Sequence, residues 1–204
     1  SWSTIGYLDD LNRVDVGDLK RFYMRWYGPN NAVLTVAGDI TVEKVLELAT
    51  KYFGSIPRGP AVKPQTVAPV VLTENRYISY EDNVKLPMLR MAYPSVKTNT
   101  KEDIALDALA NILSGSQGSP FYKAFIETKK AVGANAFPIS RELTGQFEFM
   151  IRANPGTALA DMEKEVYNVL KEWEKKGVTD DDMSKYKMGY KSSIIGQITT
   201  VQGK

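Results

Sequence analysis

The stretch "AVGANAFPISRELTGQFEFMIRAN", residues 131–154, contains two runs of strand-like composition joined by a short polar connection. Aromatic and β-branched residues bounded by polar turn residues are typical of strands. A connection this short joins antiparallel strands, because parallel strands need a long crossover. The sequence therefore predicts an antiparallel pair formed by residues 131–140 and 144–154.

The flanking segments extend this pair into a larger pattern. Two strand-like runs, 76–82 and 87–95, precede an amphipathic helix within 98–115 and a short helix from Ser119-Pro120 to about Lys130. A helix over 157–176 and another after Thr179 follow the pair. The order β-β-α-α-β-β-α-α predicts an α+β fold, with a mostly antiparallel sheet and helices packed on one face in two layers.

The first part of the chain has a separate pattern of helix, strand and helix. A helix is expected from Val16 to about residue 27 with Asp15 as its N-cap, then a buried strand in "NAVLTVAGD" (31–39), then a helix over 42–53 capped by Thr41. The helical spacing of Trp26 and Tyr27 with neighbouring aromatic residues assigns them to core packing.

Residues 57–69, "PRGPAVKPQTVAP", hold four of the ten prolines and few bulky apolar residues. Such segments are extended, semi-rigid spacers. The expected organisation is therefore the tail of one domain (1–56), a linker (57–69) and a second α+β domain (70–204); a long surface loop is the alternative for 57–69. The start without Met and the helix-like end predict an excised segment of a longer protein.

The composition excludes several kinds of chemistry. With no His and no Cys, the chain has no imidazole base, no thiolate nucleophile and no ligands for the usual zinc sites. A net charge of +2 gives no electrostatic basis for binding nucleic acid. No run of about 18 apolar residues is present, so no membrane span is expected.

Several short motifs suggest sites, each with a simpler structural alternative. Asp180, Asp181 and Asp182 suit a divalent cation but are more typical of a helix first turn. The loop "SGSQGSP" (114–120) lacks the Lys-Ser/Thr of a phosphate loop and is expected to connect two helices. The neighbouring carboxylates at 9–10 and 81–82 are expected to face water. An exposed edge at "FEF" (147–149) could accept an extended peptide.

Two longer motifs together resemble the pitrilysin/insulinase-type (inverzincin) zinc metallopeptidases. The first is "RWYGPNNAVLTVAGDI" (25–40) with "TVEKVLELATKYFGSIP" (41–57), and the second is "LANILSGSQGSPFYKAFIETKKAVGANAF" (109–137). The first motif matches the family pattern at Tyr27, Pro29, Asn31, Gly38, Asp39, Phe53, Gly54, Ile56 and Pro57. Gly38-Asp39 is interpreted as a strand-end turn and not as a catalytic carboxylate.

The resemblance implies a bacterial zinc protease whose H-x-x-E-H motif and further Glu ligand lie upstream of these residues. In such enzymes zinc activates a water and the motif Glu acts as general base. This chain would be a non-catalytic segment that helps to form the chamber enclosing peptide substrates, with no catalytic, metal or cofactor site of its own. The family's substrate-binding Arg and Tyr align with Glu127 and Ala134, which implies the domain after the metal-bearing half.

The implied partners are the metal-bearing N-terminal domain of the same polypeptide, a second peptidase half or homologous subunit, and peptide substrates. Whether the segment belongs to an active enzyme is left open, since an inactive scaffolding subunit of the same superfamily is an alternative; an unrelated α+β peptide-binding module is a third. The lack of Cys favours the bacterial periplasm over the cytoplasm. The isolated segment is expected to be inactive.

Overall fold

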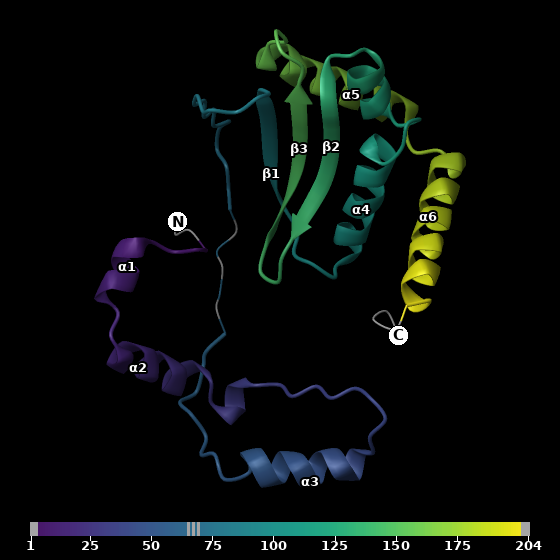
Figure 1. Cartoon of the computed structure of the whole chain (residues 1–204). Helices are drawn as coiled ribbons and strands as arrows, with labels where there is room; N and C mark the ends of the chain where they lie inside the picture. Colours follow the sequence, from purple (N-terminus) through teal and green to yellow (C-terminus); the bar gives the residue numbers. More distant parts are fainter. Residues whose placement is uncertain (1–3, 65, 67, 69, 201–204) are drawn as a thin grey trace. The chain divides into compact units, whose positions relative to one another are not determined.

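The computed structural model describes residues 4–64, 66, 68 and 70–200. The chain divides into two compact units, Ser1–Gln65 and Thr66–Lys204 (Figure 1).

The second unit is built on a sheet of three strands in the order β1-β3-β2. The strands are β1 (Met88–Ser95), β2 (Ala131–Ser140) and β3 (Gly145–Ala153), and both neighbouring pairs are antiparallel. The predicted pair over 131–154 is confirmed. Because β3 is the central strand, its backbone is paired on both sides, and the hypothesis that residues 147–149 offer a free edge to a peptide is wrong.

The helical segments of this unit lie at the positions that the sequence predicts. They are α4 (Lys101–Ser114), the short π-helical segment η2 (Tyr122–Glu127), α5 (Leu159–Lys176) and α6 (Asp180–Ile198). Thr100 caps α4 by accepting the Asp103 N–H at 3.2 Å. The helix expected from 119 to about 130 forms over residues 120–127, with Ser119 bonded at its start and residues 122–127 as the π-helical segment η2.

The core lies between one face of the sheet and the helices α4, η2 and α5. Alternate residues of β3 (Phe147, Phe149 and Ile151) are buried on this face, as the period of a strand requires. They share one cluster with Leu113, Phe121, Phe125, Met162 and Val166 from the helices. Burying each of these large side chains contributes roughly 1.5–3 kcal/mol. The predicted two-layer α+β fold is confirmed.

The first unit contains helices α1 (Leu8–Arg13), α2 (Val16–Trp26), η1 (Pro29–Asn31) and α3 (Val42–Phe53). The predicted caps are confirmed: Asp15 accepts the Asp18 N–H at 2.7 Å, and Thr41 accepts the Lys44 N–H at 3.2 Å. Residues 8–10, expected in an exposed turn, instead begin α1, and their carboxylates are exposed in its first turn.

Two of the predicted strands, 31–39 and 76–82, are absent from the described part of the chain. Extended backbone becomes a strand only when its N–H and C=O groups pair with a neighbouring strand. Their composition suits a sheet, but no described segment pairs with either run. The prediction of strands here is wrong for this chain because composition carries no information about the partner.

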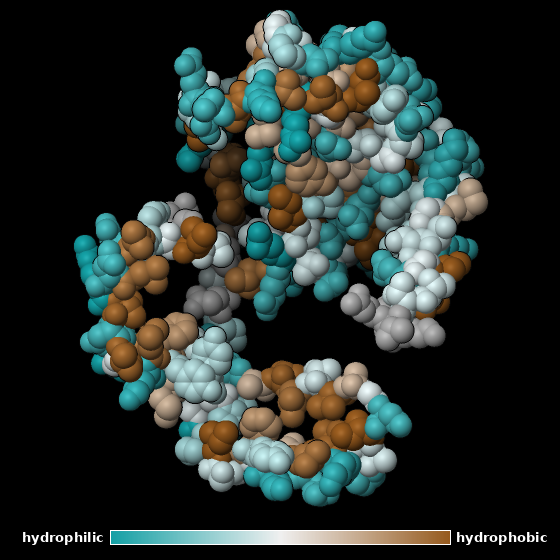
Figure 2. All heavy atoms as spheres, in the orientation of Figure 1, coloured by the Kyte–Doolittle hydropathy of each residue, from teal (hydrophilic) through white to brown (hydrophobic). Residues whose placement is uncertain are grey.

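The helices of the first unit expose their apolar faces (Figure 2). Neither α2 nor α3 contains a buried residue. Tyr27 is 62% exposed and stacks on Tyr23 with ring centroids 5.0 Å apart, while Trp26 is half-buried. The core position expected for Tyr27 is therefore not found within this unit. Short helices of 6, 11 and 12 residues enclose too little volume to bury such rings.

Candidate functional site

The Ser/Gly-rich loop 114–120 connects α4 to η2, as the sequence predicts. The Ser114 hydroxyl accepts the Ala136 N–H at 2.9 Å, which fixes the end of α4 to β2. Ser119 is only 4% exposed; its hydroxyl donates to the Ser116 carbonyl at 2.6 Å and accepts the Tyr122 N–H at 3.4 Å. Through these bonds Ser114 and Ser119 hold the loop in place.

The two positions aligned with the family's substrate-binding residues lie in different environments. Glu127 is the last residue of η2 and is exposed. Ala134 lies in β2 opposite Ile151, is 7% exposed and belongs to the core cluster. A methyl group in the core supplies no polar contact to a peptide. The alignment that assigns substrate-binding roles to these two positions stays a prediction.

The face of the sheet opposite the core contains a buried carboxylate, Glu148, whose side chain is fully buried. Arg90 of β1 binds it through two hydrogen bonds, Nε to Oε2 and Nη2 to Oε1, each 2.6 Å long. The Gln146 amide also donates to Oε1. The hydrogen bond to Glu148 raises the pKa of Arg90. With its oxygens occupied by these donors, Glu148 is equipped for structural support and not for acid–base chemistry.

Sequence reasoning missed this pair, although a signal existed. Glu148 stands between the core residues Phe147 and Phe149, so the strand period directs it to the other face. A charge in the middle of a sheet needs a partner on an adjacent strand. An arginine in the preceding strand, Arg90, is the natural partner.

A cluster of tyrosines joins β1 to α5. The Tyr93 and Tyr167 hydroxyls lie 3.2 Å apart, and the Tyr77 hydroxyl donates to Glu163 at 3.4 Å. Burial is the main reason that the pKa of Tyr93 is raised well above its usual range, and the hydrogen bond to Tyr167 adds to it. The Tyr93 hydroxyl therefore acts as a neutral hydrogen-bonding group at neutral pH.

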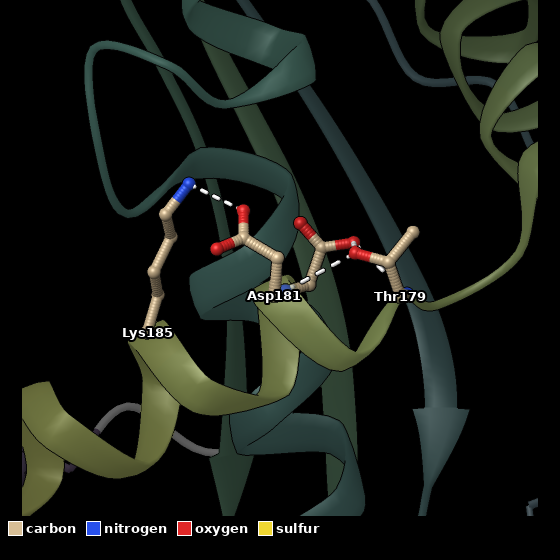
Figure 3. A network of polar contacts seen from close by, with 4 residues as sticks. Thr179, Asp181 and Lys185 are labelled. Carbon is tan, nitrogen blue, oxygen red and sulfur yellow. Dashed lines mark hydrogen bonds and ion pairs between the residues drawn. The ribbon is translucent and has the colours of Figure 1, made fainter.

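The acidic run at the start of α6 is a helix cap (Figure 3). Asp182 and Thr179 form a capping box: the Thr179 hydroxyl accepts the Asp182 N–H at 3.1 Å, and the Asp182 carboxylate accepts the Thr179 N–H at 3.1 Å. Asp181 binds Lys185 at 2.6 Å. The hydrogen bonds from Thr179 lower the pKa of Asp182. The capping interpretation of this run is confirmed.

No group of three His, Cys, Asp or Glu side chains among the described residues is arranged to hold a metal ion. The chain also lacks the His and Cys residues that zinc prefers. The residues present therefore do not fit zinc, and no step of zinc chemistry is assigned to them. Among the residues described, no helix has the length and apolar character needed to cross a bilayer.

Comparison with known proteins identifies the class. The family model for the peptidase M16 inactive domain matches residues 13–190. The chain belongs to the peptidase M16 family, as a region of its inactive-domain type. The resemblance found in the sequence is confirmed.

Its relatives include bacterial zinc proteases. The chain is 27% identical over 202 residues to the zinc protease PqqE of Helicobacter pylori, covering 97% of this chain and 45% of that protein. It is 31% identical over 101 residues to the probable zinc protease PqqL of Escherichia coli, covering 48% of this chain and 11% of that protein. The chain thus spans less than half the length of either relative.

Solved structures share the fold. A protease from Helicobacter pylori matches with a TM-score of 0.77 and 24% identity, over 99% of this chain and 50% of that one. The peptidase M16 inactive domain from Pseudomonas fluorescens matches with a TM-score of 0.72 and 18% identity, over 96% of this chain and 48% of that one. The first half of the periplasmic protease PqqL from Escherichia coli matches with a TM-score of 0.68 and 19% identity, over 98% and 44%.

Proposed function

We propose that this chain is a non-catalytic segment of a zinc metalloendopeptidase and helps to form the chamber that encloses peptide substrates. The observation that carries the proposal is the match of residues 13–190 to the M16 inactive domain in a chain with no His and no Cys. Zinc bound by residues outside this chain would supply a Lewis acid for peptide hydrolysis. The residues of this chain would shape and support the chamber.

The metal-bearing N-terminal domain of the same polypeptide is the partner that best accounts for the surface of the first unit. Phe22, Tyr23 and Leu46 are each more than half exposed on α2 and α3. An exposed apolar surface of this kind is typical of an interface. Residues 32–37, which no described strand pairs, offer backbone donors and acceptors to a sheet in that partner. A second peptidase half, or a homologous subunit, would close the chamber.

The compartment proposed for the protein is the bacterial periplasm. The Escherichia coli relative PqqL is described as a periplasmic protease, and this chain carries no Cys that an oxidising compartment would pair. Secretion of a fusion to a reporter that is active only in the periplasm tests this assignment. Reporter activity confined to the cytoplasm would contradict it.

The function is tested by comparing the full-length protein with this segment. Full-length protein should bind about one zinc per chain, measured by elemental analysis, and should cleave an unstructured peptide, while residues 1–204 do neither. Stoichiometric, tight zinc binding by the segment alone would overturn the proposal. A full-length protein without zinc and without cleavage would favour the alternative, a scaffolding subunit derived from the same superfamily.

The proposed partner is tested by complementation. The preceding half, produced as a separate chain, should bind this segment and gain peptidase activity when the two are mixed. Leu46→Ser and Phe22→Ser should weaken that binding, because each removes an exposed apolar side chain from the proposed interface. The matched control Val132→Ser changes an exposed apolar residue of the second unit and should leave binding unchanged. Equal binding by all of these variants would exclude the proposed interface.

A further inference from the structure

The second unit contains a cavity of about 590 Å³ that the proposed function does not use. It lies between the end of α4, the loop 116–120, η2, α5 and the start of α6. Small-molecule sites in proteins typically measure roughly 300–1,000 Å³. The size of this cavity therefore suits a small ligand or the last residues of a peptide.

Part of the cavity lining is apolar. Ile112, Ala124, Val169 and Trp173 contribute to it, and each of these residues is half-buried. The Trp173 indole N–H is buried without an acceptor among the described residues. These side chains favour a ligand with an apolar body.

The carboxylates in the lining already have partners. Glu165 binds Lys130 at 2.9 Å, and Glu172 binds Lys175 at 2.6 Å. The Asp182 carboxylate accepts hydrogen bonds from Thr179 in the capping box described above. Glu165 and Glu172 are therefore paired with cations, whereas Asp182 keeps its charge and is bonded only by neutral donors.

Two lysines of the cavity lining differ from these carboxylates in having no bonded partner among the described residues. Lys123 and Lys176 lie on η2 and α5, and both are exposed. Within the described part of the chain, neither has a hydrogen bond or an ion pair, although Lys176 lowers the pKa of Asp182 through space, after the larger effect of Thr179. The third lining lysine, Lys185, is bound to Asp181. Two lysines without a bonded partner stand against one carboxylate, Asp182, that no cation binds, so the charge still available to a ligand is positive on balance.

We propose that this cavity binds a carboxylate attached to an apolar group. The apolar body would contact Val169 and Trp173, and the carboxylate would accept hydrogen bonds from Lys123 and Lys176. A small organic acid and the C-terminal residue of an apolar peptide share this chemistry. The proposal does not rest on the peptidase assignment, because all of the residues involved belong to the second unit and none takes part in metal chemistry.

Isothermal titration of residues 1–204 with three probes tests the ligand class. N-acetyl-Leu-Leu with a free carboxylate and 4-phenylbutyrate represent the peptide and organic-acid sources, and the C-terminal amide of N-acetyl-Leu-Leu is the neutral control. At least one acid should bind with one-to-one stoichiometry, and the amide should bind about tenfold more weakly than the peptide acid or not at all. The acid that binds with the higher affinity identifies whether the ligand is a peptide C-terminus or a small organic acid.

Matched variants locate the site. Lys123→Met and Lys176→Met should each weaken binding of the acid by about tenfold, whereas Lys171→Met, on α5 outside the cavity, should bind as the wild type does. Binding should change the fluorescence of the protein, and Trp173→Phe should remove that change. The proposal fails if neither acid saturates at about 10 mM. It also fails if the amide binds as tightly as the peptide acid. It fails equally if Lys123→Met and Lys176→Met both bind the acid as tightly as the wild type does.

Discussion

Arg90 and Glu148 form a two-point ion pair across β1 and β3, with Nε–Oε2 and Nη2–Oε1 distances of 2.6 Å. The two residues are diagonal neighbours, because Ala92 is the direct partner of Glu148 in the strand register. The pair is asymmetric: the Glu148 side chain is fully buried, while the Arg90 side chain is 55% exposed. The buried carboxylate therefore depends on a cation that reaches it from the surface.

Replacing Arg90 with Met should destabilise the second unit by about 2–3 kcal/mol, because it leaves Glu148 charged and buried without its main partner. Urea unfolding followed by circular dichroism measures the loss. Adding Glu148→Gln to this variant should recover most of it, since a neutral amide costs less to bury than a carboxylate. If the double variant is as unstable as Arg90→Met alone, the charge of Glu148 is not the cause.

Removing the Thr179 hydroxyl should alter both the start of α6 and the titration of Asp182. Thr179→Val should cost about 1 kcal/mol of helix stability. The pKa of Asp182 should rise toward its usual value, because hydrogen bonds from Thr179 are the main reason that it is lowered. An NMR titration of the carboxyl carbons measures this change. The pKa of Glu172, which Lys175 lowers, should not move.

The sign of the pH dependence at this cap follows from the lowered pKa of Asp182. A carboxylate whose folded-state pKa lies below its unfolded value contributes stability above the unfolded pKa and loses it as pH falls through the folded value. The loss of helix stability caused by Thr179→Val should therefore be largest near neutral pH. The difference in helix stability between the variant and the wild type should become smaller below about pH 4. A difference that stays constant down to acidic pH would show that Asp182 contributes no charge-dependent stability.

Asp107 on α4 should behave in the opposite way. Burial, and secondarily Asp103, raises the pKa of Asp107. Its folded-state pKa thus lies above its unfolded value, so the charged form opposes folding once the pH exceeds the folded pKa. Asp107→Asn should increase stability at pH 7 and give no increase below about pH 4. Asp103→Ala is a contrasting control, since it removes the oxygen that accepts the Asn99 N–H at 2.9 Å and should destabilise.

Ser140 at the end of β2 has a buried hydroxyl without a hydrogen-bond partner among the described residues. Ser140→Ala should therefore stabilise the second unit by about 1 kcal/mol, because it removes a polar group whose desolvation is not offset by a hydrogen bond. Ser119→Ala is the matched control: it removes a buried hydroxyl that makes two hydrogen bonds, and it should destabilise. Thermal unfolding of both variants checks the opposite signs. Equal destabilisation by both would show that Ser140 has a partner.

Local signals account for the parts of the fold that the sequence predicts correctly. Thr41 and Thr179 each precede an amphipathic or acidic first turn, and a cap depends only on residues within one turn of it. The strands 131–140 and 144–154 are separated by a short connection, so their pairing is also local. In all of these cases the residues that decide the structure lie within a few positions of one another.

The features that were predicted wrongly or missed from the sequence depend on residues far apart in it. Residues 31–39 have the composition of a strand but lack a partner within the described chain, and pairing is not encoded in composition. The contact between Tyr93 and Tyr167 joins residues 74 positions apart, and the Arg90–Glu148 pair spans 58. The cavity depends on five segments from α4 to α6, and no short motif contains it.

The boundary between the two units follows a contact between the linker and the first unit. The first part of the predicted linker is attached to the first unit, because the Asn30 side chain accepts the Gly59 N–H at 2.7 Å and donates to the Pro60 carbonyl at 3.2 Å. We propose that the independent domain begins after this attachment, so residues 70–204 produced alone should fold and unfold cooperatively. A fragment 70–204 without cooperative unfolding would contradict the boundary.

Limited proteolysis with subtilisin should cut the whole chain within residues 57–69 before it cuts elsewhere, since this segment holds no helix or strand among its described residues. Asn30→Ala should accelerate cleavage within 57–64, because it frees the backbone at residues 59 and 60. Asn31→Ala removes a hydrogen bond to the Trp26 carbonyl instead, so it should leave that rate unchanged. Mass spectrometry of the fragments gives the sites. First cuts outside 57–69 would mean that this stretch is a packed surface loop and not a linker.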